Sequence, residues 1–365
     1  MGESTTVPGD KHFFFATDAP RIAGSEIWLA ETLPRLVAYG SKITLALPVT
    51  PTLEPLVSRL VPRVRVLRYK NFTELAFEAE RADIRLLQAW FPGTYRILNY
   101  WRNPRWVIAH EPLLYHYPLG LRTLYQLIFR YTKARAMRKA DGVLTCSRWA
   151  AEHLEAVYGL KALGVPNGVD LAKFRPPDPK EREHLRRRFG FTKFTWVMPA
   201  RYSVEKNHVV ALLTTRKVPE ADFIFVGDGA LRPAFNRLAR LLGARNARFW
   251  PFVEDMPELY RAADGLFFPS LAENQSLTTL EAMASELPVV TSDIPAQREL
   301  VENGREGFTL PPRPTLLAEG LARITQDPAL ANRMGRAARE RVAREHDLKH
   351  TTWELFRILS MLSAP

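Results

Sequence analysis

The sequence predicts an α/β fold made of two doubly wound domains, each a parallel sheet covered by helices. Short apolar runs alternate with amphipathic helical stretches in both halves of the chain, which is the pattern of such sheets. A chain of 365 residues that is 46% hydrophobic can build two cores. Residues 164–183 concentrate Pro, Gly, Asn and Asp between the two patterned regions, as a linker does.

In the first half, one helix and five strands are expected. The helix covers residues 25–40, with Gly40 at its end. The expected strands are the apolar runs at residues 12–18, 42–48, 64–69, 84–90 and 105–111.

The second half repeats the alternation of strands and helices. Its expected strands are residues 195–201, 221–229, 247–252, 265–270 and 287–293. Helices are expected between them, at residues 229–243 and 256–264. Doubly wound sheets bind ligands at the C-terminal ends of their strands, so the polar residues that follow these runs are the candidate site residues.

The expected domain boundaries follow from these patterns. The first domain is residues 1–172 and the second is residues 173–348. The amphipathic stretch 349–365 is a helix expected to pack back on the first domain.

Composition narrows the function classes. No apolar run approaches the roughly 20 residues of a membrane span or resembles a signal peptide, so a cytoplasmic location is expected. The single cysteine, Cys146, excludes an internal disulfide and a cysteine-based metal cage. Of the net charge of +12, residues 1–175 carry +9, from 24 Lys and Arg against 15 Asp and Glu. A basic half predicts an acidic partner, whereas an arginine-rich chain with solvated faces is the alternative.

The loops after two of the second-half strands carry charge and glycine. Arg201 and Lys206 follow the run at 195–200, and two cations in one loop suit a diphosphate because they stabilise its leaving oxygens without a metal. Gly227 and Asp228 lie in a tight turn that opens a helix, where glycine lets the backbone approach a ligand. Each feature by itself is also common in ordinary surface loops.

The stretch "ENQSLTTLEAMA", residues 273–284, places one acid in a polar loop and a second in a helix. Glu273 and Glu281 are eight positions apart, and Asn274, Gln275 and Ser276 precede the apolar run. The start of this helix is expected at the strand-end edge, where its unpaired N–H groups favour an anion. A capped surface helix with two unrelated acids is the alternative.

Taken together, these motifs resemble the retaining GT-B glycosyltransferases of family 4. The resemblance rests on Arg201 with Lys206, "FVGDG", "MPELYRAADGLFFPS", the Glu273 and Glu281 pair, "LPVVTSDIPAQRELVENGREGF" and "VPNGVD". It covers residues 160–345 and is looser in the first half. There, "GSE" and "AHEP" match the family's glycine-rich loop and its histidine-containing loop.

The resemblance implies a role for each site residue. Glu281 would accept hydrogen bonds from the ribose of a nucleoside diphosphate sugar, and Glu273 would bind the sugar hydroxyls. Asn274, Gln275, Ser276 and Leu277 would hold sugar and phosphate, Arg201 and Lys206 the diphosphate, and Gly227 and Asp228 the donor. His110 would contact the transferring sugar, and Gly24 and Ser25 would form the acceptor or phosphate loop.

Metal chemistry is not expected. His110 and Glu111 suggest a zinc-binding HExxH motif, but its second histidine would fall at Leu114. The alternative interpretation of His110 is a histidine whose hydrogen bonds are all made within its own loop. No Asp-x-Asp pair is present in the sequence. No cofactor is expected beyond the nucleoside diphosphate sugar as co-substrate.

A basic and apolar stretch in the first half predicts a membrane partner. Residues 113–140 contain six cations and no acid, interleaved with Leu, Ile, Phe and Tyr, as in helices that lie on anionic membranes. Residues 58–70 add five cations. Peripheral attachment to the inner face of the membrane is therefore expected, with a core helix that has a basic solvent face as the alternative.

The expected function is that of a retaining, metal-independent hexosyltransferase. It would move a hexose-type sugar to a saccharide, lipid-linked or phosphorylated acceptor, in polysaccharide or glycolipid biosynthesis. The donor base, the sugar, the acceptor, the linkage and the oligomeric state remain open. The alternatives are a GT-B nucleotide-sugar epimerase and, in a different class, a basic nucleic-acid-binding protein, although no nucleic-acid partner is expected because no binding motif is present.

Overall fold

The computed structural model describes residues 11–111, 113–114, 116–117, 119–253 and 255–363. The chain forms two compact units. The first unit is Met1–Glu111, Thr123–Asn167 and Leu348–Pro365, and the second unit is Pro112–Arg122 and Gly168–Asp347. None of the described helices is both long and apolar enough to span a membrane.

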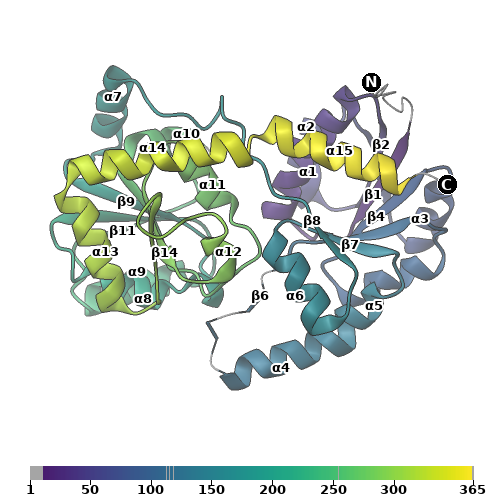
Figure 1. The fold of residues 1–365 in the computed structure, drawn as a ribbon, viewed down its shortest axis with the longest axis horizontal. Helices are drawn as coiled ribbons and strands as arrows, with labels where there is room; N and C mark the ends of the chain where they lie inside the picture. The colour runs from purple at the N-terminus through teal and green to yellow at the C-terminus, as the bar shows by residue number, and fades with distance from the viewer. Residues whose placement is uncertain (1–10, 112, 115, 118, 254, 364–365) are drawn as a thin grey trace, which may run out of the picture. The chain divides into compact units, whose positions relative to one another are not determined.

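The first unit is built on a seven-stranded parallel sheet with the strand order β3-β2-β1-β4-β5-β7-β8 (Figure 1). Its strands are β1 (His12–Thr17), β2 (Lys42–Pro48), β3 (Arg65–Tyr69), β4 (Ile84–Gln88), β5 (Arg105–Ala109), β7 (Gly142–Thr145) and β8 (Ala162–Gly164). Strands β1, β2, β4, β5 and β7 are buried along most of their length because helices cover both faces of the sheet.

The helices of the first unit connect these strands. They are α1 (Gly24–Ala38), η1 (Pro51–Leu53), α2 (Glu54–Leu60), α3 (Phe72–Ala79), η2 (Pro92–Asn99), α4 (Leu119–Phe129), η3 (Arg130–Ala134), α5 (Arg135–Met137), α6 (Arg148–Tyr158) and α15 (Leu348–Leu362). The first residues of α4 belong to the second unit. Helix α15, yellow in Figure 1, packs against α1, where Phe356 contacts Phe13 and the Tyr39 hydroxyl donates to the Lys349 carbonyl at 3.0 Å.

The second unit is built on a six-stranded parallel sheet with the order β11-β10-β9-β12-β14-β15. Its strands are β9 (Phe194–Pro199), β10 (Ala221–Val226), β11 (Ala247–Trp250), β12 (Gly265–Phe268), β14 (Val289–Ser292) and β15 (Gly307–Leu310). A separate antiparallel pair joins β6 (Leu113–Leu114) to β13 (Ala272–Glu273). The helices are α7 (Pro179–Phe189), η4 (Val204–Lys206), α8 (His208–Thr215), α9 (Arg232–Leu241), α10 (Met256–Ala262), α11 (Leu277–Ala284), α12 (Pro295–Arg298), α13 (Pro314–Gln326) and α14 (Pro328–Glu345).

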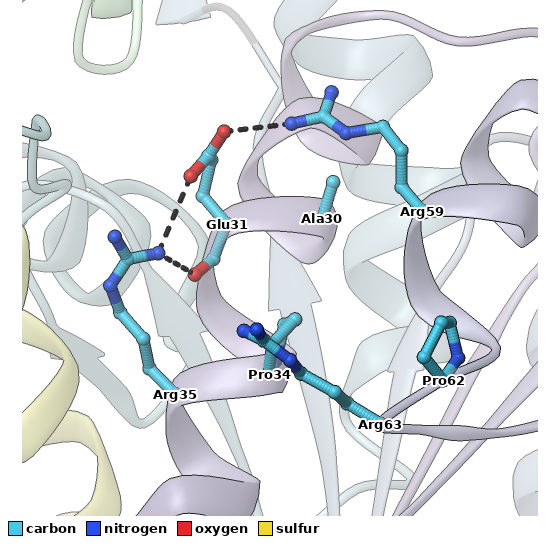
Figure 2. Close-up of a pocket in the computed structure, with 7 residues that line it drawn as sticks. All are labelled: Ala30, Glu31, Pro34, Arg35, Arg59, Pro62 and Arg63. Atoms are coloured by element: carbon cyan, nitrogen blue, oxygen red, sulfur yellow. Dashed lines mark hydrogen bonds and ion pairs between the residues drawn. The ribbon is translucent and has the colours of Figure 1, made fainter. Parts of the chain in front are cut away.

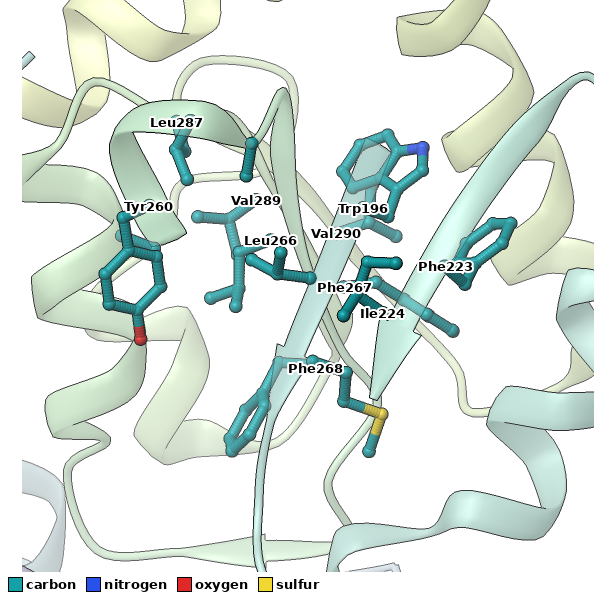
Figure 3. Close-up of a cluster of buried hydrophobic side chains, with 14 of the residues drawn as sticks. Trp196, Phe223, Ile224, Tyr260, Leu266, Phe267, Phe268, Leu287, Val289 and Val290 are labelled. Atoms are coloured by element: carbon teal, nitrogen blue, oxygen red, sulfur yellow. The ribbon is translucent and has the colours of Figure 1, made fainter. Parts of the chain in front are cut away.

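The core of the second unit is packed around aromatic residues on the central strands (Figure 3). Trp196 on β9 is fully buried and lies beside Gly265 on β12, its partner in the strand register. A Cβ atom at Gly265 would lie 2.4 Å from the indole ring, so only glycine fits there. The packing of this pair fixes β12 against β9, and the loops that follow these two strands carry most of the candidate site.

In each sheet, the strand order along the chain changes direction at one place. In the second unit, β10 and β11 extend from β9 to one side, whereas β12, β14 and β15 extend to the other. The carboxyl ends of β9 and β12 flank this reversal, which is the usual ligand-binding position in such sheets. The reversal in the first unit lies between β1 and β4.

The predicted fold class is confirmed, since both units are parallel α/β layers, and the structure adds elements that the pattern did not predict. Strands β7, β8 and β15 are only three or four residues long and were not among the expected strands. The compact units also differ from the expected segments. They divide after Asn167, and residues 112–122 belong to the second unit because β6 pairs with β13.

Candidate functional site

The loop after β9 carries the two predicted cations. Lys206 ends the short η4 turn, and its Nζ lies 2.5 Å from Glu273 Oε1 and 5.2 Å from the centre of the Phe268 ring. The side chains of Lys206 and Glu273 are 15% and 10% exposed, so the ion pair is largely removed from water. Arg201 is about half exposed, and its guanidinium lies 3.7 Å from Glu205. Each cation therefore has a carboxylate neighbour.

Glu273 is held in place by two contacts in addition to its ion pair. Ser270 Oγ donates to Glu273 Oε1 at 2.7 Å, and the backbone of Glu273 pairs with Leu113 of β6. The loop around it is tied to the β9 loop, because Leu271 N donates to the Glu205 carbonyl at 2.7 Å. The acid and the lysine are thus positioned by loops that hold one another.

Helix α11 begins directly after this acid. Ser276 is its N-cap, and its Oγ accepts from Thr279 N at 3.1 Å. Asn274, Gln275 and Ser276 are buried, and Leu277 is partly buried. The N–H groups of the first turn favour an anion. Glu281 lies one turn further, where its Oε2 accepts from the Tyr260 hydroxyl at 3.2 Å. Burial raises the pKa of Tyr260, so this hydroxyl remains a donor.

The glycine turn after β10 packs directly on the β9 loop. Gly227 has a φ of 150°, and a Cβ atom there would lie 2.2 Å from the Ala200 carbonyl oxygen. The Tyr202 N–H donates to the Asp228 carbonyl at 3.3 Å. The Asp228 side chain is exposed, 3.6 Å from Arg232. Glycine is therefore needed for the contact between these two loops.

A segment from the first half of the sequence belongs to this region. Besides the β6 and β13 pairing, His116 N donates to the Leu271 carbonyl at 3.2 Å, and His116 Nε2 lies 2.5 Å from Asp293 Oδ1. This contact could not be predicted from the sequence, since strands of two residues have no apolar pattern.

The remaining predicted residues lie in the first unit. Gly24 and Ser25 begin α1, next to the buried carboxylate of Glu26. Ser25 Oγ donates to Glu26 at 2.9 Å, as do Gln88 Nε2 at 2.9 Å and Trp90 Nε1 at 3.2 Å. Burial raises the pKa of Glu26, while these donors oppose the rise. Glu26 therefore joins the loops after β1 and β4 at the point where this sheet reverses.

His110 follows β5 and packs against Trp28, with ring centres 5.1 Å apart and the ring planes tilted by 59°. Its Nε2 atom is buried and has no hydrogen-bond partner among the described residues. Burial lowers the pKa of His110 to about 4, so the imidazole is neutral at neutral pH.

The structure brings together Lys206, Glu273 and the start of α11, and it places Arg201, Gly227 and Glu281 on adjoining loops and helices of the same unit. His110, Gly24 and Ser25 belong to the other unit. Sequence reasoning missed the partners of the two acids, Ser270 and Tyr260, because a serine after a strand and a tyrosine in a helix carry no distinctive pattern. Among the described residues, no three His, Cys, Asp or Glu side chains group as a metal site.

Two parallel α/β units, with cations, carboxylates and a helix N-terminus at the strand-reversal point of the second, define the GT-B class. Comparison with known proteins identifies the family. The model for Glycosyltransferase Family 4 matches residues 22–173, and the model for Glycosyl transferases group 1 matches residues 181–341. The chain belongs to family 4 of the GT-B glycosyltransferases.

Relatives with assigned activities include two bacterial transferases. The chain is 30% identical over 204 residues to the UDP-Gal:α-D-GlcNAc-diphosphoundecaprenol α-1,3-galactosyltransferase of Escherichia coli, covering 50% of each chain. It is 27% identical over 365 residues to a D-inositol 3-phosphate glycosyltransferase of Streptomyces avermitilis, covering 86% of this chain and 78% of the relative. The chain spans about half the length of several curated relatives that it matches.

A solved structure shows the same fold over nearly the whole chain. HepE of Anabaena, in complex with UDP-glucose, superposes with a TM-score of 0.82 at 20% identity, covering 96% of this chain and 99% of HepE. The two alternatives, an epimerase and a nucleic-acid-binding protein, do not appear in the names of the matched family models or of these relatives.

Proposed function

We propose that the protein transfers a hexose-type sugar from a nucleoside diphosphate sugar to a saccharide, lipid-linked or phosphorylated acceptor, with retention at the anomeric carbon and without a metal. The observation that carries the proposal is the largely buried Lys206 and Glu273 pair beside the N-terminus of α11, at the strand reversal of the second unit. A cation and a helix N-terminus bind a diphosphate, and a fixed carboxylate binds sugar hydroxyls.

Each residue then has a role that its surroundings support. Lys206 and Arg201 bind the diphosphate, and the exposed Arg201 side chain can swing from Glu205 to a phosphate. Glu281, oriented by Tyr260, accepts from the ribose hydroxyls. Glu273 orients the sugar. His110, neutral at neutral pH, donates or accepts a single hydrogen bond at a sugar hydroxyl and adds no second positive charge.

The donor proposed first is a UDP sugar. HepE was solved with UDP-glucose, and the name of the E. coli relative includes UDP-Gal. The names of the E. coli and Streptomyces relatives favour the acceptor class, since the first specifies a diphosphoundecaprenol-linked sugar and the second an inositol phosphate. The net charge of +12 suits either acidic acceptor.

A thermal-shift screen of UDP, GDP and ADP sugars tests the donor. A ligand at about 100 times its dissociation constant adds about 2.7 kcal/mol of stability, which is readily detected. UDP sugars are expected to stabilise the protein most. NMR of the product formed with a lipid-linked acceptor then tests the stereochemistry, and an inverted anomer would contradict the retaining mechanism.

Peripheral membrane attachment is part of the proposal, and exposed apolar residues support it. Leu124, Leu127, Ile128 and Tyr131 have the i, i+3, i+4 and i+7 spacing of one helix face, and all are exposed. Several nearby cations are already engaged, since Lys133 pairs with Glu111 at 2.7 Å and Arg138 donates to the Tyr158 carbonyl at 2.8 Å. The apolar face, more than the charge, therefore supplies the membrane contact.

Vesicle co-sedimentation tests this attachment. The wild-type protein is expected to pellet with anionic vesicles and less with neutral ones. Changing Leu124 and Ile128 together to Ser should release it, whereas Leu241→Ser, at an exposed leucine of the second unit, should not. Equal pelleting of all three proteins would show that this face does not bind the membrane.

A further inference from the structure

A groove of about 430 Å³ lies on the first unit, between α1 and the end of α2 (Figure 2). One wall is α1, which contributes Glu31, Pro34 and Arg35. The other wall is the end of α2 and the turn after it, which contribute Arg59, Pro62 and Arg63. Three arginines and one acid give the lining a formal charge of +2.

Glu31 organises two of the arginines. Its Oε1 accepts from Arg59 at 2.9 Å, and its Oε2 accepts from Arg35 at 3.3 Å. Arg35 is fixed further because its NH1 also donates to the Glu31 carbonyl at 2.6 Å. One carboxylate thus holds two guanidinium groups in place from opposite walls of the groove, while each guanidinium has more N–H donors than these contacts use.

Arg63 is the third cation, and its guanidinium has no hydrogen bond or ion pair with any described residue. Figure 2 shows its side chain extended toward Pro34. Other arginines of the basic run at residues 58–70 are neutralised, since Arg65 pairs with Glu78 at 3.0 Å and Arg68 with Glu54 at 2.7 Å. Among the described arginines of this run, Arg63 is therefore the one whose guanidinium is not paired with a carboxylate, and it lies at the groove.

We propose that this groove binds a phosphate-type dianion, either a phosphomonoester or a diphosphate. Guanidinium groups are always charged, and their planar fork matches phosphate oxygens with two parallel bonds. The two prolines make the walls stiff, so little conformational entropy is lost on binding. The anion belongs either to a soluble phosphorylated molecule or to a lipid headgroup. The site does not depend on the proposed transfer function.

Calorimetric titration of the full chain with inorganic phosphate tests the proposal. Arg63→Gln should weaken phosphate binding up to about fivefold, the upper end for one exposed ion pair, and the Arg59→Gln/Arg63→Gln double variant should abolish it. The matched control is Arg96→Gln, which removes an exposed arginine of the same unit and should leave the affinity unchanged. Glu31→Gln should strengthen binding, because it releases the two guanidinium groups from their carboxylate.

Two further measurements separate the sources and the two sites. The first is binding to phosphatidic acid vesicles, with phosphatidylcholine vesicles as the reference. If the double variant loses vesicle binding, the ligand is a lipid headgroup. If the double variant loses only phosphate binding, the ligand is a soluble molecule. UDP binding should be unchanged in every variant, so a failure of this proposal is distinct from a failure of the proposed function. If the double variant binds phosphate and vesicles as Arg96→Gln does, or the wild type binds neither, the proposal is wrong.

Discussion

Replacing Lys206 with Met tests whether the ion pair with Glu273 organises the site. The change leaves a carboxylate that is 10% exposed with Ser270 as its nearest charge-stabilising donor. Breaking a fully buried ion pair costs about 3–5 kcal/mol. Because both side chains retain some contact with water, we expect a loss of about 2–3 kcal/mol in the free energy of unfolding of the second unit. That corresponds to a fall of roughly 4–12 °C in its melting temperature.

Differential scanning calorimetry measures this fall. Lys217→Met is the matched control, since Lys217 is exposed and has no ion pair among the described residues. Adding Glu273→Gln to Lys206→Met should recover part of the loss, because the uncompensated charge is removed. If Lys206→Met melts like Lys217→Met, or if the two changes are additive, the pair does not organise the site.

Three further predictions concern the same unit. Gly227→Ala should lower both the melting temperature and the affinity for UDP, because its Cβ would lie 2.2 Å from the Ala200 carbonyl oxygen; an unchanged melting curve would contradict this. Burial, and next the nearby Lys206, lower the pKa of His208 from 6.5 to about 4. As the pH falls, the unfolded chain binds the proton before the folded protein does. The stabilisation is therefore complete above pH 6.5 and is lost toward pH 4, by roughly 3 kcal/mol for a shift of that size. Chemical denaturation should show that the free energy of unfolding changes less with pH in His208→Leu than in the wild type, and an equal change in both would refute the argument. Sugar transfer should continue in excess EDTA, and strict dependence on added magnesium or manganese would show that a metal stabilises the leaving group.

Much of the fold could be predicted from the sequence because long apolar runs are unambiguous. The runs at 12–18 and 221–229 became strands β1, which is buried from Phe13 onward, and β10, which is buried throughout, and the alternation of strands and helices predicted the fold class. Strands β6 and β13 could not be predicted, since their two-residue pairing depends on tertiary contacts. For the same reason, the assignment of residues 112–122 to the second unit was not visible in the sequence.

The candidate site was predicted as a set of residue types, and the structure supplied their contacts. Arg201 and Lys206 were expected to act together on a diphosphate, but their nearest acids are different, Glu205 and Glu273. The sequence pattern indicates which charged residues follow the strands. It does not indicate where a long side chain such as arginine or lysine points, because that depends on the residues packed around it. The basic run at 113–140 illustrates the same limit, since several of its cations bond within the first unit while several of its apolar residues, among them Leu124 and Ile128, are exposed.

Calorimetric titration of the wild-type protein and Glu281→Ala with UDP and UDP-glucose tests the central claim, that the second unit binds a nucleoside diphosphate sugar. The control is Glu319→Ala, which removes an exposed acid on α13. Charge-assisted hydrogen bonds of the kind expected between Glu281 and a ribose contribute about 1.5–3 kcal/mol. The wild type and the control are therefore expected to bind equally, and Glu281→Ala roughly tenfold or more weakly. Equal binding by all three folded proteins, or no binding of UDP, GDP or ADP by the wild type, would contradict the claim.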